Sequence, residues 1–352
     1  MSSVLPAPFP QIRIGVVGLG MGSAPHFKAL HDLAPDVEVA WVHARNADRL
    51  AAATVPTGAQ KTTRLADMLE DRSVKAVLVL TPPNTHLDIV EQVARAGKHV
   101  LVEKPLEASL DKAQALVEVC ERHSVQLGVM LQHRMRQGAR ALAALMKSGQ
   151  LGELLSVHAS VRWWRPQSYY DEPGRGTLAR DGGGVLMTQA IHTLDLMLNF
   201  TGMPEFVLGL TRTSPLHDME CEDVAAALLQ FPGGAVGTLQ ASTAANPGYA
   251  ERIELDFTLG TATLLGGALM VHFANGTTMD AGEPKNAGGG ANAMDFDHAA
   301  HRLVLQDFLA AVQKGSTPRV TGRSALDVHR LIQAITDSSA SQFPVLLNAP
   351  RA

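Results

Sequence analysis

Cysteine is scarce in this sequence: Cys120 and Cys221 are the only two among 352 residues. This composition indicates neither a disulfide framework nor a metal site. No apolar run is long enough to span a bilayer, and the residues up to Gln11 lack the charged and apolar segments of a signal peptide. We therefore expect a protein of the reducing cytoplasm with no membrane partner.

Charge of one sign is not concentrated anywhere in the chain. The 30 lysines and arginines against 34 aspartates and glutamates give a formal net charge of −4, without a basic block. Nucleic acid is bound through clustered lysine and arginine, so it is a poor candidate partner.

Strand-like and helix-like segments alternate in the first part of the chain. The expected strands are 12–17, 37–43, 74–80, 99–102 and 126–131, and the expected helices are 24–33, 47–53, 86–96 and 110–123. Such alternation is typical of a doubly wound parallel sheet. We therefore predict an α/β dinucleotide-binding domain over residues 1–134.

The pattern changes after that point. Expected helices cover 139–148, 186–200, 301–313 and 325–338, and expected strands cover 154–164, 205–211, 223–231, 235–242, 252–258, 262–265 and 269–272. Turn formers separate the later strands, which predicts an antiparallel meander. Residues 135–352 would form a second, α+β domain, with a loop or lid at 282–297.

Gly18-Leu-Gly20 follows the first expected strand and precedes the first expected helix. Gly18 would permit a tight turn, and Gly20 would let a pyrophosphate approach backbone N–H groups at the helix N-terminus. Ser23 stands where the full pattern has a third glycine or an alanine. The motif predicts a dinucleotide site, although a glycine turn without a ligand is the alternative.

The end of the second expected strand bears on the choice of dinucleotide. NAD sites usually offer Asp or Glu there, whereas this chain has His43-Ala44-Arg45-Asn46. Arg45, together with Arg49, could pair with a 2′-phosphate. Alternatively, Arg45 is solvated and Asn46 caps the next helix. We predict NADP as the preferred cofactor, with NAD as the alternative.

Two further motifs carry chemistry. Lys104 follows the expected strand 99–102, at the sheet edge where open α/β folds bind ligands. Thr188, His192 and Asp195 recur at helical spacing and would share one face of the helix 186–200. We predict these four residues to be catalytic, although a solvent-facing stripe would also explain the helix.

Each of the four has an expected role. Lys104 would polarise a carbonyl or relay a proton, because desolvation lowers the pKa of a lysine. His192 would be its acid/base partner, and Asp195 would orient the histidine ring. Thr188 could orient a substrate oxygen but could not act as a carboxylate base.

The series of motifs resembles the Gfo/Idh/MocA oxidoreductase family over nearly the whole chain. The motifs are Gly18-Leu-Gly20, Thr81-Pro-Pro-Asn-Thr-His86, Glu103-Lys104-Pro105, Gln132-His-Arg134 and the stretch from Gly182 to Asp195. The resemblance implies a Rossmann domain followed by an open, mainly antiparallel sheet domain that binds substrate and mediates a homodimer or homotetramer. It also implies that the Lys104–Pro105 bond can be cis. The family has Asp or Asn at the position of Thr188, which weakens a triad of the polyol type.

Together with the resemblance, the motifs predict a cofactor site that draws residues from several segments of the chain. The predicted cofactor-binding residues are Gly18, Gly20, Met21, Arg45, Thr81, Pro82, Asn84, His86, Glu103 and Gln132.

A segment rich in arginine and aromatic residues precedes the helix at 186–200. Its Arg165, Tyr169 and Arg175, together with Arg134, are the predicted substrate contacts, because aromatic faces stack on sugars and arginines bind phosphate or carboxylate. The segment partly resembles family members that act on nucleotide-linked amino sugars, although Gly174 stands where an aromatic often does. Core packing of the loop is the alternative.

His298 and His301 could face the same pocket or simply begin a helix.

The predicted reaction is a reversible, nicotinamide-dependent interconversion of a secondary alcohol and a ketone on a small sugar-like or cyclic polyol substrate. Free sugars or polyols, nucleotide-linked sugars and cyclic dihydrodiols all remain candidate substrates. A cofactor-binding sensor on the same fold is the other class of function, although a pure binder would need neither Lys104 nor His192.

Overall fold

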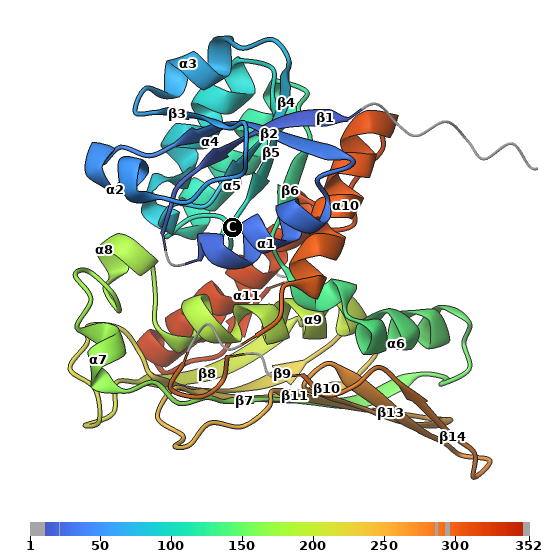
Figure 1. Cartoon of the computed structure of the whole chain (residues 1–352). Helices are drawn as coiled ribbons and strands as arrows, with labels where there is room; N and C mark the ends of the chain where they lie inside the picture. Colours follow the sequence, from blue (N-terminus) through green and yellow to red (C-terminus); the bar gives the residue numbers. More distant parts are fainter. Residues whose placement is uncertain (1–10, 21, 286–287, 293–295, 348–352) are drawn as a thin grey trace, which may run out of the picture.

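The protein forms two β-sheets stacked with helices between them (Figure 1). The coordinates are a computed structural model, which describes residues 11–20, 22–285, 288–292 and 296–347. No helix among these residues is long and apolar enough to cross a membrane.

The first sheet has six parallel strands in the order β3-β2-β1-β4-β5-β6. The strands are β1 (Ile12–Val17), β2 (Val37–His43), β3 (Gln60–Thr62), β4 (Val74–Val79), β5 (His99–Val102) and β6 (Leu127–Val129). The central strands are almost wholly apolar because helices cover both of their faces. The strand order reverses between β1 and β4, and this switch point is where doubly wound sheets open a crevice at their carboxyl ends.

The helices of this unit follow the strands in turn. They are α1 (Ser23–Asp32), α2 (Ala47–Ala52), α3 (Leu65–Glu70), α4 (His86–Arg95) and α5 (Leu110–Arg122), with the short helices η1 (Pro83–Thr85) and η2 (Gln132–Met135). Local signals fix several helix ends: Asn46 and Ser109 cap α2 and α5, and Gly97 follows α4 with a positive φ.

The second sheet has nine strands in the order β14-β13-β12-β11-β7-β10-β9-β8-β15. The strands are β7 (Leu154–Arg162), β8 (Phe206–Arg212), β9 (Val224–Gln230), β10 (Val236–Ser242), β11 (Arg252–Phe257), β12 (Gly260–Leu265), β13 (Ala268–Phe273), β14 (Thr278–Ala281) and β15 (Val345–Leu346). All neighbours are antiparallel except β7 and β10. The expected antiparallel meander is thus confirmed, but it is divided into two parts. Strands β8–β10 and strands β11–β14 lie on opposite sides of the central strand β7.

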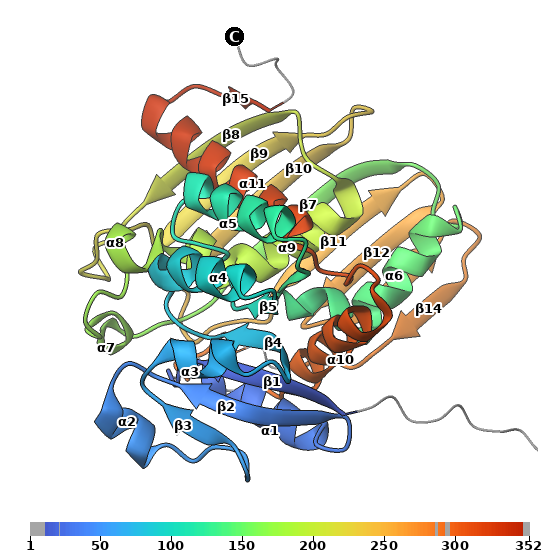
Figure 2. The same ribbon diagram turned by 90° about the horizontal axis from the view of Figure 1, so that it is seen from above.

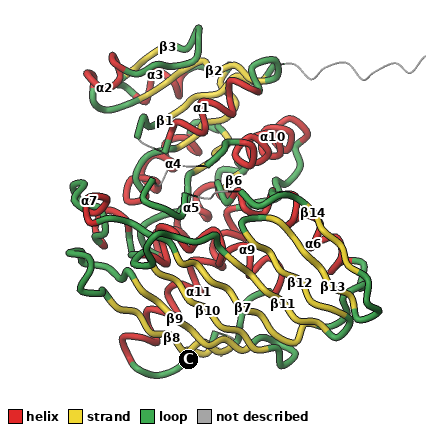
Figure 3. The backbone as a smooth tube through the Cα atoms, turned by 60° about the horizontal axis from the view of Figure 1, so that its bottom comes forward, coloured by secondary structure: helices red, strands yellow, loops and turns green. Residues whose placement is uncertain are grey.

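Three helices cover one face of this sheet and separate it from the first. They are α6 (Gln137–Lys147), α9 (Ile191–Thr201) and α11 (Gly322–Ser341). Helix α5 of the first unit packs on α11 (Figure 2). Figure 3 brings the opposite face forward, and no helix among the described residues covers it there.

Helix α10 (Ala299–Lys314) belongs late in the sequence but packs against α1 and η2 of the first unit (Figure 1). Leu305 and Phe308 are fully buried in the same apolar cluster as Ile14 and Leu78. The chain therefore returns to the first sheet after building most of the second.

Several short elements of the structure are not predicted by the sequence pattern. Strand β3 has only three residues, two of them exposed, and α3, β14 and β15 are also short. The loop before residue 186 contains the one-turn helices α7 (Gln167–Tyr170) and α8 (Leu178–Asp181). The expected helix 186–200 begins as a π-helical turn, η3 (Leu186–Ala190), before α9. The predicted lid at 282–297 lies partly outside the described residues.

Candidate active site

A cavity of about 1110 Å³ lies between the two units. Its walls include the turn after β1, the ends of β2 and β4, the segment after β5, and residues of η3, α9 and α10. This is the place that the switch point of the first sheet predicts for a ligand.

The turn after β1 fits a dinucleotide. Gly18 has φ +107°, and a Cβ there would lie 2.8 Å from backbone atoms of Leu80, so only glycine suits the position. A Cβ on Gly20 would meet nothing within 4 Å, which leaves open space above the start of α1. That space is where a pyrophosphate would contact the helix N-terminus. Met21, also predicted to bind the cofactor, lies outside the described residues.

The end of β2 supplies positive charge to the same cavity. Arg45 and Arg49 both line it. Asn46 accepts a 2.7 Å hydrogen bond from the backbone N–H of Arg49, so it caps α2, as the alternative interpretation proposed. The cap holds Arg49 in place without occupying either guanidinium.

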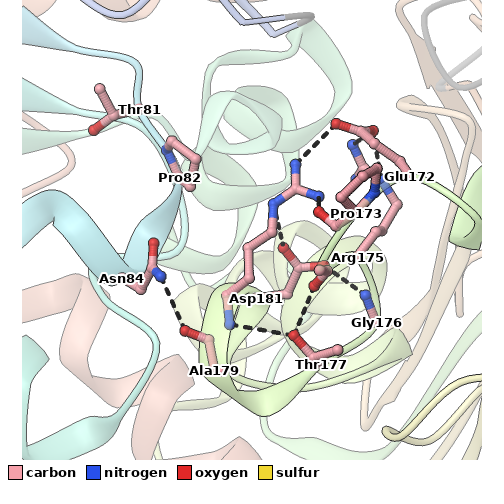
Figure 4. A network of polar contacts seen from close by, with 12 residues as sticks. Thr81, Pro82, Asn84, Glu172, Pro173, Arg175, Gly176, Thr177, Ala179 and Asp181 are labelled. Atoms are coloured by element: carbon pink, nitrogen blue, oxygen red, sulfur yellow. Dashed lines mark hydrogen bonds and ion pairs between the residues drawn. The ribbon is translucent and has the colours of Figure 1, made fainter. Parts of the chain in front are cut away.

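Four other predicted cofactor residues, Thr81, Pro82, Glu103 and Gln132, also line the cavity, whereas Asn84 and His86 do not. Asn84 donates to the carbonyl of Ala179 at 3.0 Å and so joins the two units (Figure 4). His86 is fully buried. Its Nε2 lies 2.8 Å from the Thr81 carbonyl, and its Nδ1 lies 3.1 Å from that of Pro105. Neither side chain lines the cavity in the structure, and their roles toward a cofactor stay predictions.

Lys104 projects into the cavity from the segment after β5, and the Lys104–Pro105 peptide is cis. Its Nζ donates to the backbone carbonyl of Thr188 at 2.7 Å. Burial lowers the pKa of Lys104. The carboxylate of Glu103 acts in the opposite direction, and the positive charge of Arg165 lowers the pKa further. The ammonium group is therefore readier to lose its proton than an exposed lysine.

His192 lines the cavity from the first turn of α9. Its ring stacks on that of His133, with centroids 4.8 Å apart, and its Nδ1 is buried without a hydrogen-bond partner among the described residues. Burial, followed by the charge of Lys104, holds the pKa of His192 well below its usual range. The imidazole is therefore neutral around pH 7. His133 was missed because nothing in the sequence pairs it with a residue 59 positions later.

Comparison with known proteins agrees with this geometry. Residues 12–131 match the oxidoreductase family with an NAD-binding Rossmann fold, and residues 139–263 match the GFO/IDH/MocA C-terminal domain. The chain belongs to the Gfo/Idh/MocA oxidoreductases. The family resemblance and the two-sheet fold class are thereby confirmed, and the protein is a nicotinamide-dependent dehydrogenase.

The relatives resemble this chain over most of its length. The scyllo-inositol 2-dehydrogenase (NAD(+)) of Bacillus subtilis is 26% identical over 97% of this chain and 98% of its own length. The myo-inositol 2-dehydrogenase of Thermotoga maritima is 29% identical over 69% of this chain and 72% of its own. The WlbA dehydrogenase of Bordetella pertussis, solved with NADH and UDP-GlcNAcA, superposes with a TM-score of 0.82 and 27% identity, covering 97% of this chain and all of that one.

Asp195 is paired with Arg134 in this Gfo/Idh/MocA protein. Its carboxylate accepts two bonds from Arg134, one from Nε at 2.7 Å and one from Nη2. Arg134 also reaches the Ser324 hydroxyl of α11 at 3.3 Å. Neither Asp195 nor Arg134 lines the cavity. The two residues form an ion pair that joins η2, α9 and α11, and the catalytic role of Asp195 and the substrate role of Arg134 stay predictions.

Thr188 lines the cavity, but its hydroxyl donates to the carbonyl of Gly184 at 2.7 Å. Glu222 holds the start of the π-helical turn that carries Thr188. Its carboxylate accepts hydrogen bonds from the backbone N–H groups of Gly184 and Leu186, both at 3.0 Å. A Cβ on Gly184 would lie 1.7 Å from the Glu222 carbonyl oxygen, which explains the need for glycine. Glu222 was missed because it lies more than 30 residues away, on the segment before β9.

A second unpredicted group surrounds Glu103. The Nε2 of His26 lies 2.6 Å from Glu103 Oε1, and the backbone N–H of Lys104 donates to Oε2 at 2.9 Å. Burial alone would raise the pKa of Glu103, but the hydrogen bond and charge of His26 outweigh it and bring the value to about 2. His26, Glu103 and His301 offer ligand atoms within 4.8 Å of one another, a spacing that a metal ion could use. The contacts with His26 and with the backbone N–H of Lys104 hold the Glu103 carboxylate in place.

Of the two histidines predicted near the start of the penultimate helix, His301 lines the cavity. His298 instead lies 2.8 Å from Asp32 on α1, away from the cavity.

The predicted substrate residues Arg165, Tyr169 and Arg175 form one wall of the cavity. Arg175 pairs with Glu172 and donates to the Tyr169 hydroxyl at 2.9 Å. Glu172 also accepts a 3.0 Å bond from Arg180, so it pairs with two guanidinium groups. The segment thus presents cationic and aromatic side chains to the same space as Lys104.

Proposed function

We propose that this oxidoreductase interconverts a secondary alcohol and a ketone on a sugar-like or cyclic polyol substrate, with Lys104 moving the proton. The observation that carries the proposal is the position of the Lys104 ammonium, which shares one cavity with the glycine turn and with neutral His192. Residues 1–134 would contribute most of the cofactor site, and residues 135–352 most of the substrate site.

When bound, the cofactor supplies or accepts the hydride. In alcohol oxidation, neutral Lys104 would accept the hydroxyl proton; in ketone reduction, its ammonium would polarise the carbonyl and donate that proton. Neutral His192 would form a hydrogen bond with the same substrate oxygen and hold it toward Lys104. Thr188 keeps the lysine aimed, because its backbone carbonyl accepts the Nζ bond. Glu103, which is fixed by His26, would border the nicotinamide.

Substrate class is supported by the relatives. Two are named for inositols, which are cyclic polyols, and the structural relative was solved with UDP-GlcNAcA, a nucleotide-linked sugar. A ring that carries several hydroxyl groups suits a cavity lined by tyrosine, tryptophan and arginine.

For the cofactor we propose NADP in preference to NAD, because Arg45 and Arg49 line the cavity at the end of β2. Arg45→Ala should weaken NADPH binding by at least roughly tenfold and leave NADH binding nearly unchanged. Fluorescence titration of both reduced dinucleotides tests this, and an equal loss for both would refute the assignment to a 2′-phosphate.

The main test is turnover with NADP and NAD against polyols, free sugars, nucleotide sugars and dihydrodiols, followed by absorbance of the reduced nicotinamide. Lys104→Met should lower kcat by roughly 10²- to 10⁴-fold, the usual contribution of general acid–base catalysis, and leave dinucleotide binding within a few-fold. Lys112→Met, at an exposed position of α5, is the matched control. Full turnover by Lys104→Met would exclude the assigned role.

We also propose a homodimer or homotetramer built on the helix-free face of the nine-stranded sheet. That face exposes large apolar side chains on several strands, among them Leu210, Leu228, Val236 and Met270. Light scattering at micromolar concentration measures the state, and a monomer would contradict the proposal.

A further inference from the structure

Arg165 is a buried cation without a counter-ion in the part of the chain that the structure describes. The side chain lines the cavity, yet the residue is only 2% exposed. Its Nη1 donates to the backbone carbonyls of Trp164 at 2.8 Å and Gly290 at 2.6 Å. Its Nε is buried and has no partner among the described residues. Arg175 on the same wall differs, because Glu172 neutralises it.

The surroundings make this arrangement costly unless a ligand completes it. Burial of an ionised group away from water is strongly unfavourable when no opposite charge lies nearby. Carbonyl dipoles compensate only part of a full charge. The charge of Arg165 also lowers the pKa of Lys104, so the two cations act on each other across the cavity. The wall therefore favours a ligand that carries negative charge.

The guanidinium is also held rigidly. It lies 5.4 Å from the ring centre of Trp163 and 5.3 Å from that of Tyr169. The backbone of Arg165 is fixed as well: its N–H donates to the Thr243 carbonyl at 2.9 Å, and its carbonyl oxygen lies 2.9 Å from Nε2 of His217. A cation fixed between two aromatic rings loses little side-chain entropy when it binds a ligand, which is the arrangement expected of a recognition residue.

We propose that Arg165 binds a carboxylate of the substrate, so that the substrate is a sugar acid or a carboxylated cyclic polyol. The inference rests on the proposed function, because it names the substrate class of the same site. One uncompensated guanidinium matches the single negative charge of a carboxylate better than the nearly double charge of a phosphate monoester. Because the two backbone carbonyls bind Nη1, the remaining N–H donors are those of Nε and Nη2. These two nitrogens form one edge of the planar guanidinium group, and such an edge can pair with both oxygens of a carboxylate.

The test compares acids with their neutral partners. Protein saturated with reduced dinucleotide is titrated with glucuronate against glucose, galacturonate against galactose, and quinate against myo-inositol, with nicotinamide fluorescence as the readout. The reduced cofactor prevents turnover of these alcohols during the titration. In at least one pair the acid should bind roughly tenfold or more tightly than its partner, the effect expected of a charge-assisted hydrogen bond.

Arg165→Gln should remove that preference and leave the Kd of the neutral partner within about twofold, which also shows that the variant is folded. Arg162→Gln is the matched control, since Arg162 is exposed at the end of β7, shortly before Arg165, and lies over the Tyr249 ring instead of lining the cavity. Equal Kd values for acid and neutral ligands in the unsubstituted protein overturn the inference without any variant. So does a preference that survives in Arg165→Gln, or tighter binding of glucose 6-phosphate than of glucuronate.

Turnover measured separately distinguishes the two proposals. Preferential binding of acids without any oxidation in the presence of NADP or NAD would remove the proposed function and keep the carboxylate site. Oxidation of neutral polyols by the unsubstituted protein, with acids that are neither bound nor oxidised better than their neutral partners, would keep the proposed function and remove the carboxylate site.

Discussion

The ion pair of Arg134 with Asp195 allows a sharp test of what these residues do. Both side chains are largely buried, at 11% and 1% exposed, and two parallel hydrogen bonds join them. Asp195→Leu would leave a buried guanidinium without its anion, at a cost of about 3–5 kcal/mol in the free energy of unfolding. Arg134→Met should cost a similar amount, because it leaves the carboxylate unpaired.

The double variant should recover most of this loss, because apolar side chains of similar volume replace the whole pair. Urea unfolding followed by circular dichroism gives the four stabilities, and the double-mutant cycle gives the coupling energy. The exposed pair of Arg252 with Glu254, 48% and 37% exposed, is the control and should couple by about 1 kcal/mol or less.

Activity decides between a structural and an orienting role. Since Asp195 forms its hydrogen bonds with Arg134 and none with His192, the folded double variant should keep its kcat within a few-fold. Additive stability losses would refute the buried-pair argument. A double variant that is stable and binds dinucleotide, yet has lost kcat, would restore Asp195 to the catalytic group.

Three further outcomes are expected. Because the pKa of Glu103 is lowered from 4.5 to about 2, its carboxylate stabilises the folded protein by roughly 3 kcal/mol above pH 4.5, and this contribution is lost as the pH falls toward 2. The free energy of unfolding of Glu103→Gln should therefore depend less steeply on pH in this range. An unchanged pH dependence would contradict this explanation. Gly20→Ala should weaken dinucleotide binding in a stably folded protein, whereas Gly18→Ala should also lower the melting temperature, because only the second Cβ meets backbone. Arg165→Gln should raise the pKa of Lys104 by removing a like charge, so the acidic limb of the pH–rate profile for alcohol oxidation should move to higher pH; a shift to lower pH would reverse the argument.

The sequence predicts those parts of the site that depend on local patterns. Gly18 and Gly20 stand between an apolar strand and a helix, and Lys104 follows another strand, so their common sheet edge follows from the alternation of elements. The i, i+4 spacing likewise brings Thr188 and His192 to one wall of the cavity.

Interactions between distant segments escape this kind of prediction. Asp195 shares the helical spacing of His192, but α9 packs against η2, so its carboxylate pairs with Arg134, 61 positions earlier. His86 is polar, as a cofactor contact would be, but in the buried position that it occupies both ring nitrogens lie against backbone carbonyls. Glu222 and His26 carry no local signal at all, because their partners come from other elements. Strand β3, with three mostly exposed residues, has too little hydrophobic pattern to be detected.

The path of α10 has a practical consequence for protein engineering. A Cβ on Gly128 of β6 would lie 2.8 Å from the ring of Phe308, so the helix rests closely on the first sheet. A fragment that ends at residue 134 would leave this apolar surface bare and should aggregate. Exchange of cofactor-binding modules between relatives therefore requires three crossover sites, one after residue 134 and one on each side of α10, so that the helix is exchanged together with the sheet that it covers.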